Sequence, residues 1–403
     1  MNDLAIPAAG HYSKRGEKRM ESNKSLSSKN RHSGLDLLRI LAMIMIVCGH
    51  FLGFVNDNHL VSDSSVLYHF TYFISALCMP AVNCFVLISA FFLSERQFKL
   101  SRIIKLDLTV LFYSAVLWFI GVKFGSTAIL SEETINSFFP ISFGNYWYIS
   151  AYVGMVFLSP LLNLFISKIN RRQHLITTCF LVLLFAVWCD ILPRSNPFSV
   201  GSGYCLSWFV VLYLIASYLK KYGSSEKMNK RHHGMIYFGM VLLLFLSFFV
   251  LNIMLKGEFF QVHKFSEYLY RYNSIIVLVE SIALFLFFKN VSLSSKPVER
   301  ISSIIVPVVL DVYLIHTNRN VNIQIWQFLI NQFQICAEWA FPLKMVAITL
   351  IVFISCIIIA LIRKMCFDCF EKRKWFLNLM KKIDQFTLQA ASSIARFMEK
   401  HVL

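Results

Sequence analysis

The chain has 403 residues, of which 57% are hydrophobic and only 15% charged, and its formal net charge is +17. Its mean hydropathy is +0.60. These values exclude a soluble globular protein, because no soluble domain of this length is so apolar. They predict a membrane protein instead. The first 30 residues are basic and Ser-rich and contain no short apolar core or cleavage site, so we expect no cleavable signal peptide.

Apolar segments of membrane-spanning length recur along the whole chain. A hydrocarbon core of about 30 Å needs roughly 17–25 helical residues. Ten segments of 16–24 residues meet or come close to this length, and the sixth and ninth are the weakest. They cover 38–55, 70–93, 103–121, 146–166, 175–192, 204–219, 234–255, 272–288, 302–318 and 342–362. We therefore expect an all-α, polytopic protein with ten transmembrane helices.

The distribution of positive charge predicts the orientation of these spans. Counted from a cytoplasmic N-terminus, the inward segments carry 32 of the 39 Lys and Arg residues and the outward segments carry seven. This asymmetry follows the positive-inside rule and predicts a multi-pass protein of the cell membrane with both termini in the cytoplasm. The positive net charge indicates contact with the anionic inner leaflet and requires no nucleic acid.

The sequence divides into three regions. We expect a basic, disordered cytoplasmic tail over 1–33, a membrane domain over 34–363, and a basic amphipathic helix on the inner leaflet over 364–403. Cys366 and Cys369 form a single C-x-x-C pair without two further ligands at matching spacing. A zinc site would need those ligands, so we expect no metal site.

The first span carries ionisable residues where a bilayer disfavours them. Arg39 and His50 are eleven residues apart, and Asp36 precedes Arg39 by three. On an α-helix this spacing places Arg39 and His50 about 20° apart around the axis and about 16 Å apart along it. Such residues usually face a bundle interior or a wet cavity and mark function. The alternative for Arg39 is a salt bridge with Asp36 at the helix end.

Further candidate groups lie on the third, eighth and ninth spans. Arg102 and Lys105 are one turn apart at the start of the third span, where cations suit a phosphate-rich cytosolic ligand. Plain anchoring to the inner leaflet is the alternative. His316 lies in the expected outer half of the ninth span and is either a second functional imidazole or a core His bonded to a carbonyl. Glu280 and Asp311 are further acidic residues, and the sequence does not decide whether they orient a histidine or pair with an arginine.

Several stretches, in their order along the chain, resemble the membrane acyltransferase family 3. The first stretch, Leu35 to His50, resembles a helix of that family in which an acidic residue is followed by Arg and, after ten further residues, by His. The last stretch, Val312 to His316, resembles the family's "V-Y-L-I-H" motif. Two positions depart from the family pattern: Asn83 stands where Pro is common, and Ala90 where Gly is usual. The likeness covers about 34–363. The stretches are Leu35 to His50, Val82 to Leu93, Arg102 to Lys105, Asn145 to Tyr148 with Leu158 to Asn163, Trp208 to Tyr222, and Val312 to His316.

This resemblance implies a transmembrane O-acyltransferase. Such enzymes move an acyl group, usually acetyl, from cytosolic acyl-CoA to a hydroxyl of a cell-surface or lipid-linked glycan. His50 matches the family's essential histidine, and with Arg39 and His316 it forms the expected catalytic set. Arg39, Arg102 and Lys105 are the expected binding residues for acyl-CoA, which is a co-substrate and not a permanently bound cofactor.

The acceptor site is expected on Ser89, Trp147, Tyr148 and Tyr152. Aromatic rings can stack on a sugar, although aromatic residues near an outer membrane interface more often form a belt in the lipid headgroups. The belt is the favoured interpretation for most of these rings. The sequence does not identify the glycan or the length of the acyl group.

Two other functions stay open at this stage. The first is a glycan exporter or permease, in which the polar residues would form a path through both halves of the membrane. Spans five, seven and ten carry few polar residues, which favours the enzyme. The second is a membrane sensor coupled through the basic tails.

Overall fold

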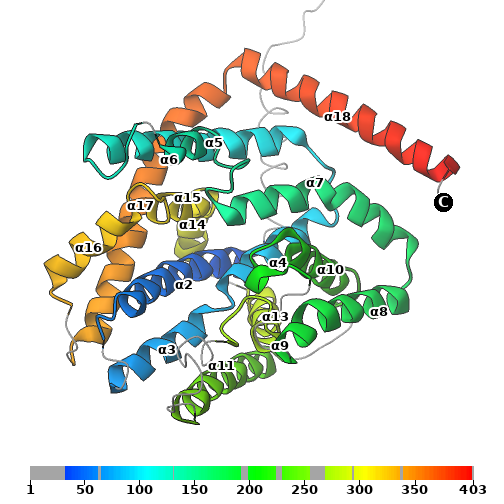
Figure 1. Cartoon of the computed structure of the whole chain (residues 1–403). Helices are drawn as coiled ribbons and strands as arrows, with labels where there is room; N and C mark the ends of the chain where they lie inside the picture. The colour runs from blue at the N-terminus through cyan, green and yellow to red at the C-terminus, as the bar shows by residue number, and fades with distance from the viewer. Residues whose placement is uncertain are drawn as a thin grey trace, which may run out of the picture.

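A computed structural model describes residues 32–61, 65–129, 131–191, 198–223, 229–254, 268–292, 295–335 and 339–401 (Figure 1). In these residues all regular secondary structure is helical and there is no strand, which confirms the all-α prediction. Most of the expected tail over 1–33, namely 1–31, lies outside the described residues.

Seven of the ten predicted spans correspond to segments long and apolar enough to cross a membrane. Five of these segments are single helices, and the other two consist of consecutive helical pieces. They are α2 (Ser33–Asp57), α3 and α4 (Val66–Cys78 and Ala81–Leu93), α5 (Leu100–Lys123), α7 (Trp147–Lys168), α8, η1 and α9 (Arg171–Val182, Leu183–Val187 and Trp188–Ile191), α11 (Lys230–Met254) and α17 (Phe341–Glu371).

The other three predicted spans are shorter helices. The sixth is α10 (Leu206–Tyr222) and the eighth is α13 (Ile275–Lys289). The ninth is broken into α14 (Lys296–Ile305), the 3₁₀ turn η4 (Val306–Val308) and α15 (Val309–His316). Pro307 lies in η4, and proline lacks the N–H that a continuous helix needs. The count of ten spans and the cytoplasmic termini stay predictions.

Short helical segments occupy three of the expected loops. They are α6 (Glu132–Phe138), the 3₁₀ turn η2 (Gly201–Gly203) and α16 (Asn322–Phe333). Gly203 has φ +89°, and an added Cβ would come within 2.8 Å of the Tyr272 Cβ. This turn therefore needs glycine and brings the chain before α10 against the segment before α13.

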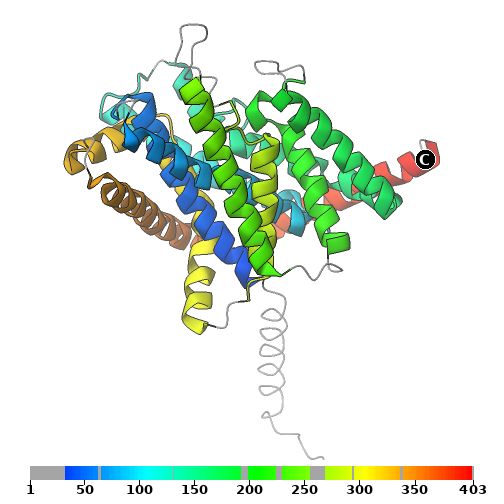
Figure 2. The same ribbon diagram turned by 90° about the horizontal axis from the view of Figure 1, so that it is seen from below.

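Helix α2 is the centre of the bundle. It packs against α3, α4, α13, α15 and α17. Gly34 allows a close approach of α2 to α13, since an added Cβ would lie 2.0 Å from the Phe288 carbonyl oxygen at the end of α13. Next to this core, α10 packs on α4, α7 and α8, and α11 packs along α13 (Figure 2).

The two positions that depart from the family pattern are well accommodated. The Asn83 amide donates to the Tyr272 carbonyl at 2.8 Å and accepts from the Trp208 indole at 3.1 Å. Asn83 thus joins α4 to α10 and to the segment before α13. Ala90 is fully buried in the core, so the helices around it remain closely packed.

The expected boundary between the membrane domain and the C-terminal region, at 363/364, falls within a helix. Helix α17 continues to Glu371, and a second helix, α18 (Lys374–His401), follows at an angle to it (Figure 1). Cys366 and Cys369 therefore lie near the end of α17, where both are exposed and free. The amphipathic pattern in the sequence predicts α18. The boundary between α17 and α18 is harder to predict, because α17 carries polar residues beyond its apolar part.

Candidate active site

The structure brings His50 of α2 into contact with His316 of α15. The His50 Nδ1 and His316 Nε2 atoms are 2.9 Å apart, and the ring centroids are 5.1 Å apart. The His316 Nδ1 lies 2.6 Å from the Val312 carbonyl oxygen one turn earlier in α15. His316 is fully buried. Each imidazole is therefore held by a neighbour at a defined ring nitrogen.

These contacts determine where the protons lie when both rings are neutral. A carbonyl oxygen only accepts, so the His316 Nδ1 carries the hydrogen and its Nε2 has the lone pair. His50 must then donate from Nδ1 to the His316 Nε2. The Nε2 of His50 is left with a lone pair, which is the form required of a general base.

A large cavity adjoins His50, and we call it the tyrosine cavity. Its volume is about 530 Å³. Its wall combines aromatic rings with polar groups, a lining that suits a sugar. It is lined by Met45, Ile46, Gly49, His50, Gly53, Asn56, Asp57, His59, Tyr68, Tyr72, Ser75, Cys78, Met79, Val82, Tyr204, Tyr270 and Tyr272.

A second cavity, the arginine cavity, has a volume of about 300 Å³. Two guanidinium groups and three hydroxyl-bearing side chains line it together with apolar residues. The polar residues are Arg39, Ser89, Arg102, Tyr148 and Tyr152, and the apolar ones are Phe85, Leu93, Ile103, Leu106, Val156, Val306, Val309 and Leu310. The cavity thus joins positive charge to an apolar wall.

A small space of about 20 Å³, the histidine passage, adjoins both cavities. It shares Phe85, Tyr148 and Leu310 with the arginine cavity. It shares Ile46, His50, Val82 and Tyr272 with the tyrosine cavity. His50 therefore lies where the two larger spaces approach each other.

The three predicted cations have different surroundings in the structure. Arg39 donates to Asp36 at 2.9 Å, as the salt-bridge alternative expected, and it also lines the arginine cavity with Arg102. Lys105 is ion-paired with Glu371 of α17, and its Nζ lies 5.6 Å from the centroid of the Phe376 ring. The expected grouping of Arg102 with Lys105 is thus not what the described side chains show, because α17 and α18 supply other partners for Lys105.

The belt interpretation is wrong for the aromatic residues at the start of α7. Tyr148 is buried and its ring stacks parallel to that of Tyr152, with centroids 6.2 Å apart. Trp147 stacks on Tyr272 and contacts Tyr204, with centroids 5.9 and 4.4 Å apart. These rings line the cavities and face neighbouring segments, because the first turns of α7 pack inside the bundle.

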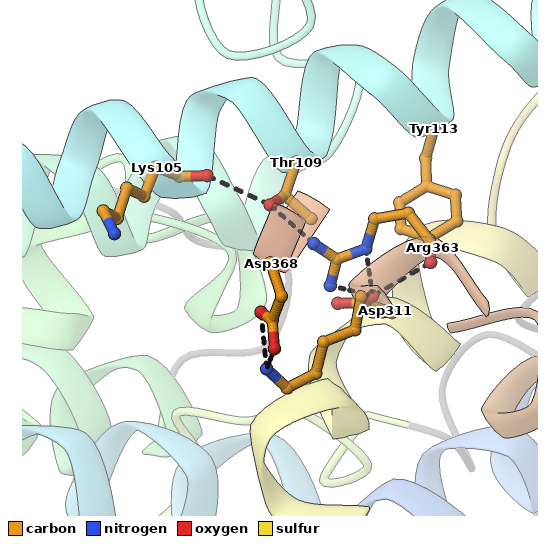
Figure 3. A network of polar contacts seen from close by, with 7 residues as sticks. Lys105, Thr109, Tyr113, Asp311, Arg363 and Asp368 are labelled. Carbon is orange, nitrogen blue, oxygen red and sulfur yellow. Dashed lines mark hydrogen bonds and ion pairs between the residues drawn. The ribbon is translucent and has the colours of Figure 1, made fainter. Parts of the chain in front are cut away.

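Asp311 belongs to a buried network between three helices (Figure 3). The Arg363 Nη2 of α17 donates to the Asp311 Oδ2 at 2.6 Å, and the Tyr113 hydroxyl of α5 donates to the same oxygen at 2.9 Å. Arg363 also reaches the Thr109 hydroxyl at 3.4 Å. Asp311 therefore fixes α15, which carries His316, against α5 and α17.

Glu280 of α13 lies apart from the described cavities. It is fully buried, and neither carboxyl oxygen has a hydrogen-bond partner among the described residues. Among the residues that the structure describes, Glu280 neither orients a histidine nor pairs with an arginine.

The sequence analysis did not identify the tyrosines outside α7 that line the tyrosine cavity. Tyr68, Tyr72, Tyr204, Tyr270 and Tyr272 lie before or within predicted spans with no motif of their own. Their clustering near the ends of the second, sixth and eighth predicted spans was the available signal. In the described part of the chain no group of three or more His, Cys, Asp or Glu residues is placed to hold a metal ion.

Comparison with known proteins places this site in a family. No curated protein and no solved structure matches the chain. The sequence model of the acyltransferase domain of acyltransferase family 3 matches residues 32–361. That region contains both histidines and every residue that lines the three cavities. The chain is a multi-pass membrane protein, and it belongs to acyltransferase family 3.

Proposed function

We propose that this protein is an O-acyltransferase of the cell membrane that moves an acyl group from cytosolic acyl-CoA to a hydroxyl of a cell-surface or lipid-linked glycan. The observation that carries the proposal is the position of His50, which lines the passage between a cationic cavity and an aromatic one and donates from Nδ1 to His316, so that its Nε2 keeps a lone pair. Membership of an acyltransferase family supports the reaction class.

The arginine cavity is the proposed donor site. Coenzyme A carries phosphates, and the Arg39 and Arg102 guanidinium groups bind phosphate oxygens with paired N–H donors. The apolar wall beside them suits the thin acyl-pantetheine arm. The arm would bring its thioester carbonyl to the histidine passage.

The tyrosine cavity is the proposed acceptor site. Tyrosine rings stack on sugar faces, and Asn56, Asp57 and Ser75 offer hydrogen-bond partners for hydroxyl groups. The histidine passage has a volume of only about 20 Å³, whereas a permease would need a path wide enough for a sugar ring. This difference in size favours transfer over the alternative of a glycan permease.

The reaction then follows from the imidazole pair. The His50 Nε2 removes the proton of the acceptor hydroxyl while the hydroxyl oxygen attacks the thioester carbonyl carbon. The bond from that carbon to sulfur breaks, and the leaving thiolate takes the proton from His50. The products are an O-acyl glycan and coenzyme A. During the transfer, His316 stabilises the positive charge on His50 by accepting its Nδ1–H.

Inverted membrane vesicles test this function directly. They expose the proposed donor side to acetyl-CoA labelled in the acetyl group, while the glycan is supplied inside the vesicles. We expect label to appear in the glycan and to be released by mild alkali, as for an ester. Competition with unlabelled succinyl-CoA and longer acyl-CoAs measures donor choice.

One result would favour the permease over the enzyme. Glycan that crosses the membrane at the same rate with and without acyl-CoA, and without gaining label, would favour the permease and contradict the enzyme. Vesicles with a His174→Ala variant serve as the matched control. His174 is also a buried histidine, bonded to the Leu214 carbonyl in a remote part of the bundle, so its loss should leave transfer unchanged.

A further inference from the structure

The first turn of α5 is capped by a residue from the far end of the chain. The residue before the helix, Lys99, makes no side-chain cap. Instead, Asp384 of α18 accepts from the Ser101 backbone N–H at 3.0 Å and from the Ser101 hydroxyl at 2.8 Å. The first N–H groups of a helix have no hydrogen-bond acceptor inside the helix. A carboxylate at this end supplies one, and its negative charge also interacts favourably with the positive end of the helix dipole.

Two more contacts hold α18 and the end of α17 on the same side of α5. Lys105, one turn after Ser101, is ion-paired with Glu371, and it lies over the ring of Phe376. Phe376 is only 3% exposed. Helix α18 contacts α5, and Figure 1 shows it running above the N-terminal part of α5 toward the C-terminus. The attachment is therefore built from a cap, an ion pair and a buried ring.

Arg102 is the residue next to Ser101, and it lines the arginine cavity. Its own backbone N–H bonds to the Lys99 carbonyl at 3.2 Å within the same first turn. A helix end without a cap frays, so the direction of the Arg102 side chain depends on how well this turn is held. Asp384 lies outside residues 32–361, the region that matches the acyltransferase domain.

We propose that Asp384 is a positioning residue, and that α18 clamps the first turn of α5 so that Arg102 faces the donor cavity. The clamp sets the affinity for the anionic donor and leaves the chemical step at His50 untouched. This inference rests on the proposed function, because it takes the arginine cavity as the site of acyl-CoA.

The test compares Asp384→Ala with Asp384→Asn and with Asp368→Ala, in the full-length protein. Asp368 is the matched control, since it pairs with Lys364 on the exposed end of α17 and not with α5. Equilibrium binding of coenzyme A gives Kd, and acyl transfer at varied acetyl-CoA gives KM and kcat separately. Loss of a helix cap is the perturbation, so we expect Asp384→Ala to raise Kd and KM roughly two- to tenfold with kcat unchanged.

Asparagine caps helices about as well as aspartate, so Asp384→Asn should restore most of the affinity, and Asp368→Ala should bind as wild type. Ser101→Ala, which removes only one of the two bonds to Asp384, should have a smaller effect that does not add to that of Asp384→Ala. If Asp384→Ala fails to fold, Ser101→Ala and Asp384→Asn still report on the cap.

Arg102→Ala separates the two proposals. If Arg102→Ala weakens coenzyme A binding while Asp384→Ala and Ser101→Ala bind as wild type, the clamp is refuted and the donor site stands. If Arg102→Ala itself binds coenzyme A as tightly as wild type, the proposed donor site is refuted, and the clamp that rests on it is refuted with it. A fall in kcat at unchanged KM in Asp384→Ala would also overturn the clamp, because it would place Asp384 in the chemical step.

Discussion

The role of His316 can be tested by removing its bond to His50. His316→Leu fills the buried position of His316 with an apolar side chain. It removes the Nε2 acceptor, which lies 2.9 Å from the His50 Nδ1. In the proposed reaction this bond becomes charge-assisted when His50 gains a proton. A hydrogen bond to a charged group contributes about 1.5–3 kcal/mol, and about 1.4 kcal/mol corresponds to a tenfold change in rate.

We therefore expect His316→Leu to lower kcat roughly 10- to 100-fold. The donor KM should stay unchanged, because His316 is not among the residues that line the arginine cavity. His316→Gln offers an amide oxygen near the position of the lost nitrogen and should recover part of the rate. The assay is the initial rate of glycan acylation per folded protein at varied acetyl-CoA. A His316→Leu variant with wild-type kcat, or with a raised donor KM alone, would refute this account of the pair.

Three further predictions concern charges in the bundle. Arg102→Ala should raise the donor KM more than Lys105→Ala does, because only Arg102 lines the arginine cavity; equal effects in a titration of rate against acyl-CoA would contradict the assignment. Arg363→Met should destabilise the fold by about 3–5 kcal/mol, because it leaves the buried Asp311 carboxylate without its charged partner; thermal unfolding in detergent should show Arg363→Met with Asp311→Leu to be more stable than Arg363→Met alone. Glu280→Met should raise the free energy of unfolding by about 1–3 kcal/mol, and with it the unfolding midpoint, because both carboxyl oxygens lack a hydrogen-bond partner in the described structure; a lower midpoint would show that the carboxyl has a partner.

The sequence was most informative where helical periodicity alone places a side chain. Arg39 and His50 share a stripe of one helix, and α2 is a continuous helix across both, as the spacing predicted. The contact between His50 and His316 joins residues 266 positions apart. Periodicity cannot establish such a contact, because it depends on how α2 packs on α15.

The environment of each residue was the harder part to predict. Arg102 and Lys105 are one turn apart in the sequence, yet three residues rotate the side chain by about 60° short of a full turn. That rotation is enough for Lys105 to meet α17 and α18 while Arg102 meets the cavity. The aromatic residues of α7 present the same problem, since composition does not show which face of a helix packs inward. The break at Pro307 had a signal in the sequence, because proline inside an apolar run interrupts a helix.

The rate of acyl transfer by His50→Ala tests the central claim most directly. The variant should be expressed and inserted as wild type, which His174→Ala controls for as a buried histidine away from the cavities. Losing a positioned general base should lower acylated glycan per folded protein by roughly 10²–10⁴-fold, with coenzyme A binding unchanged. Near-wild-type transfer by His50→Ala would contradict the assignment of His50 as the base, and with it the mechanism built on the passage between the two cavities.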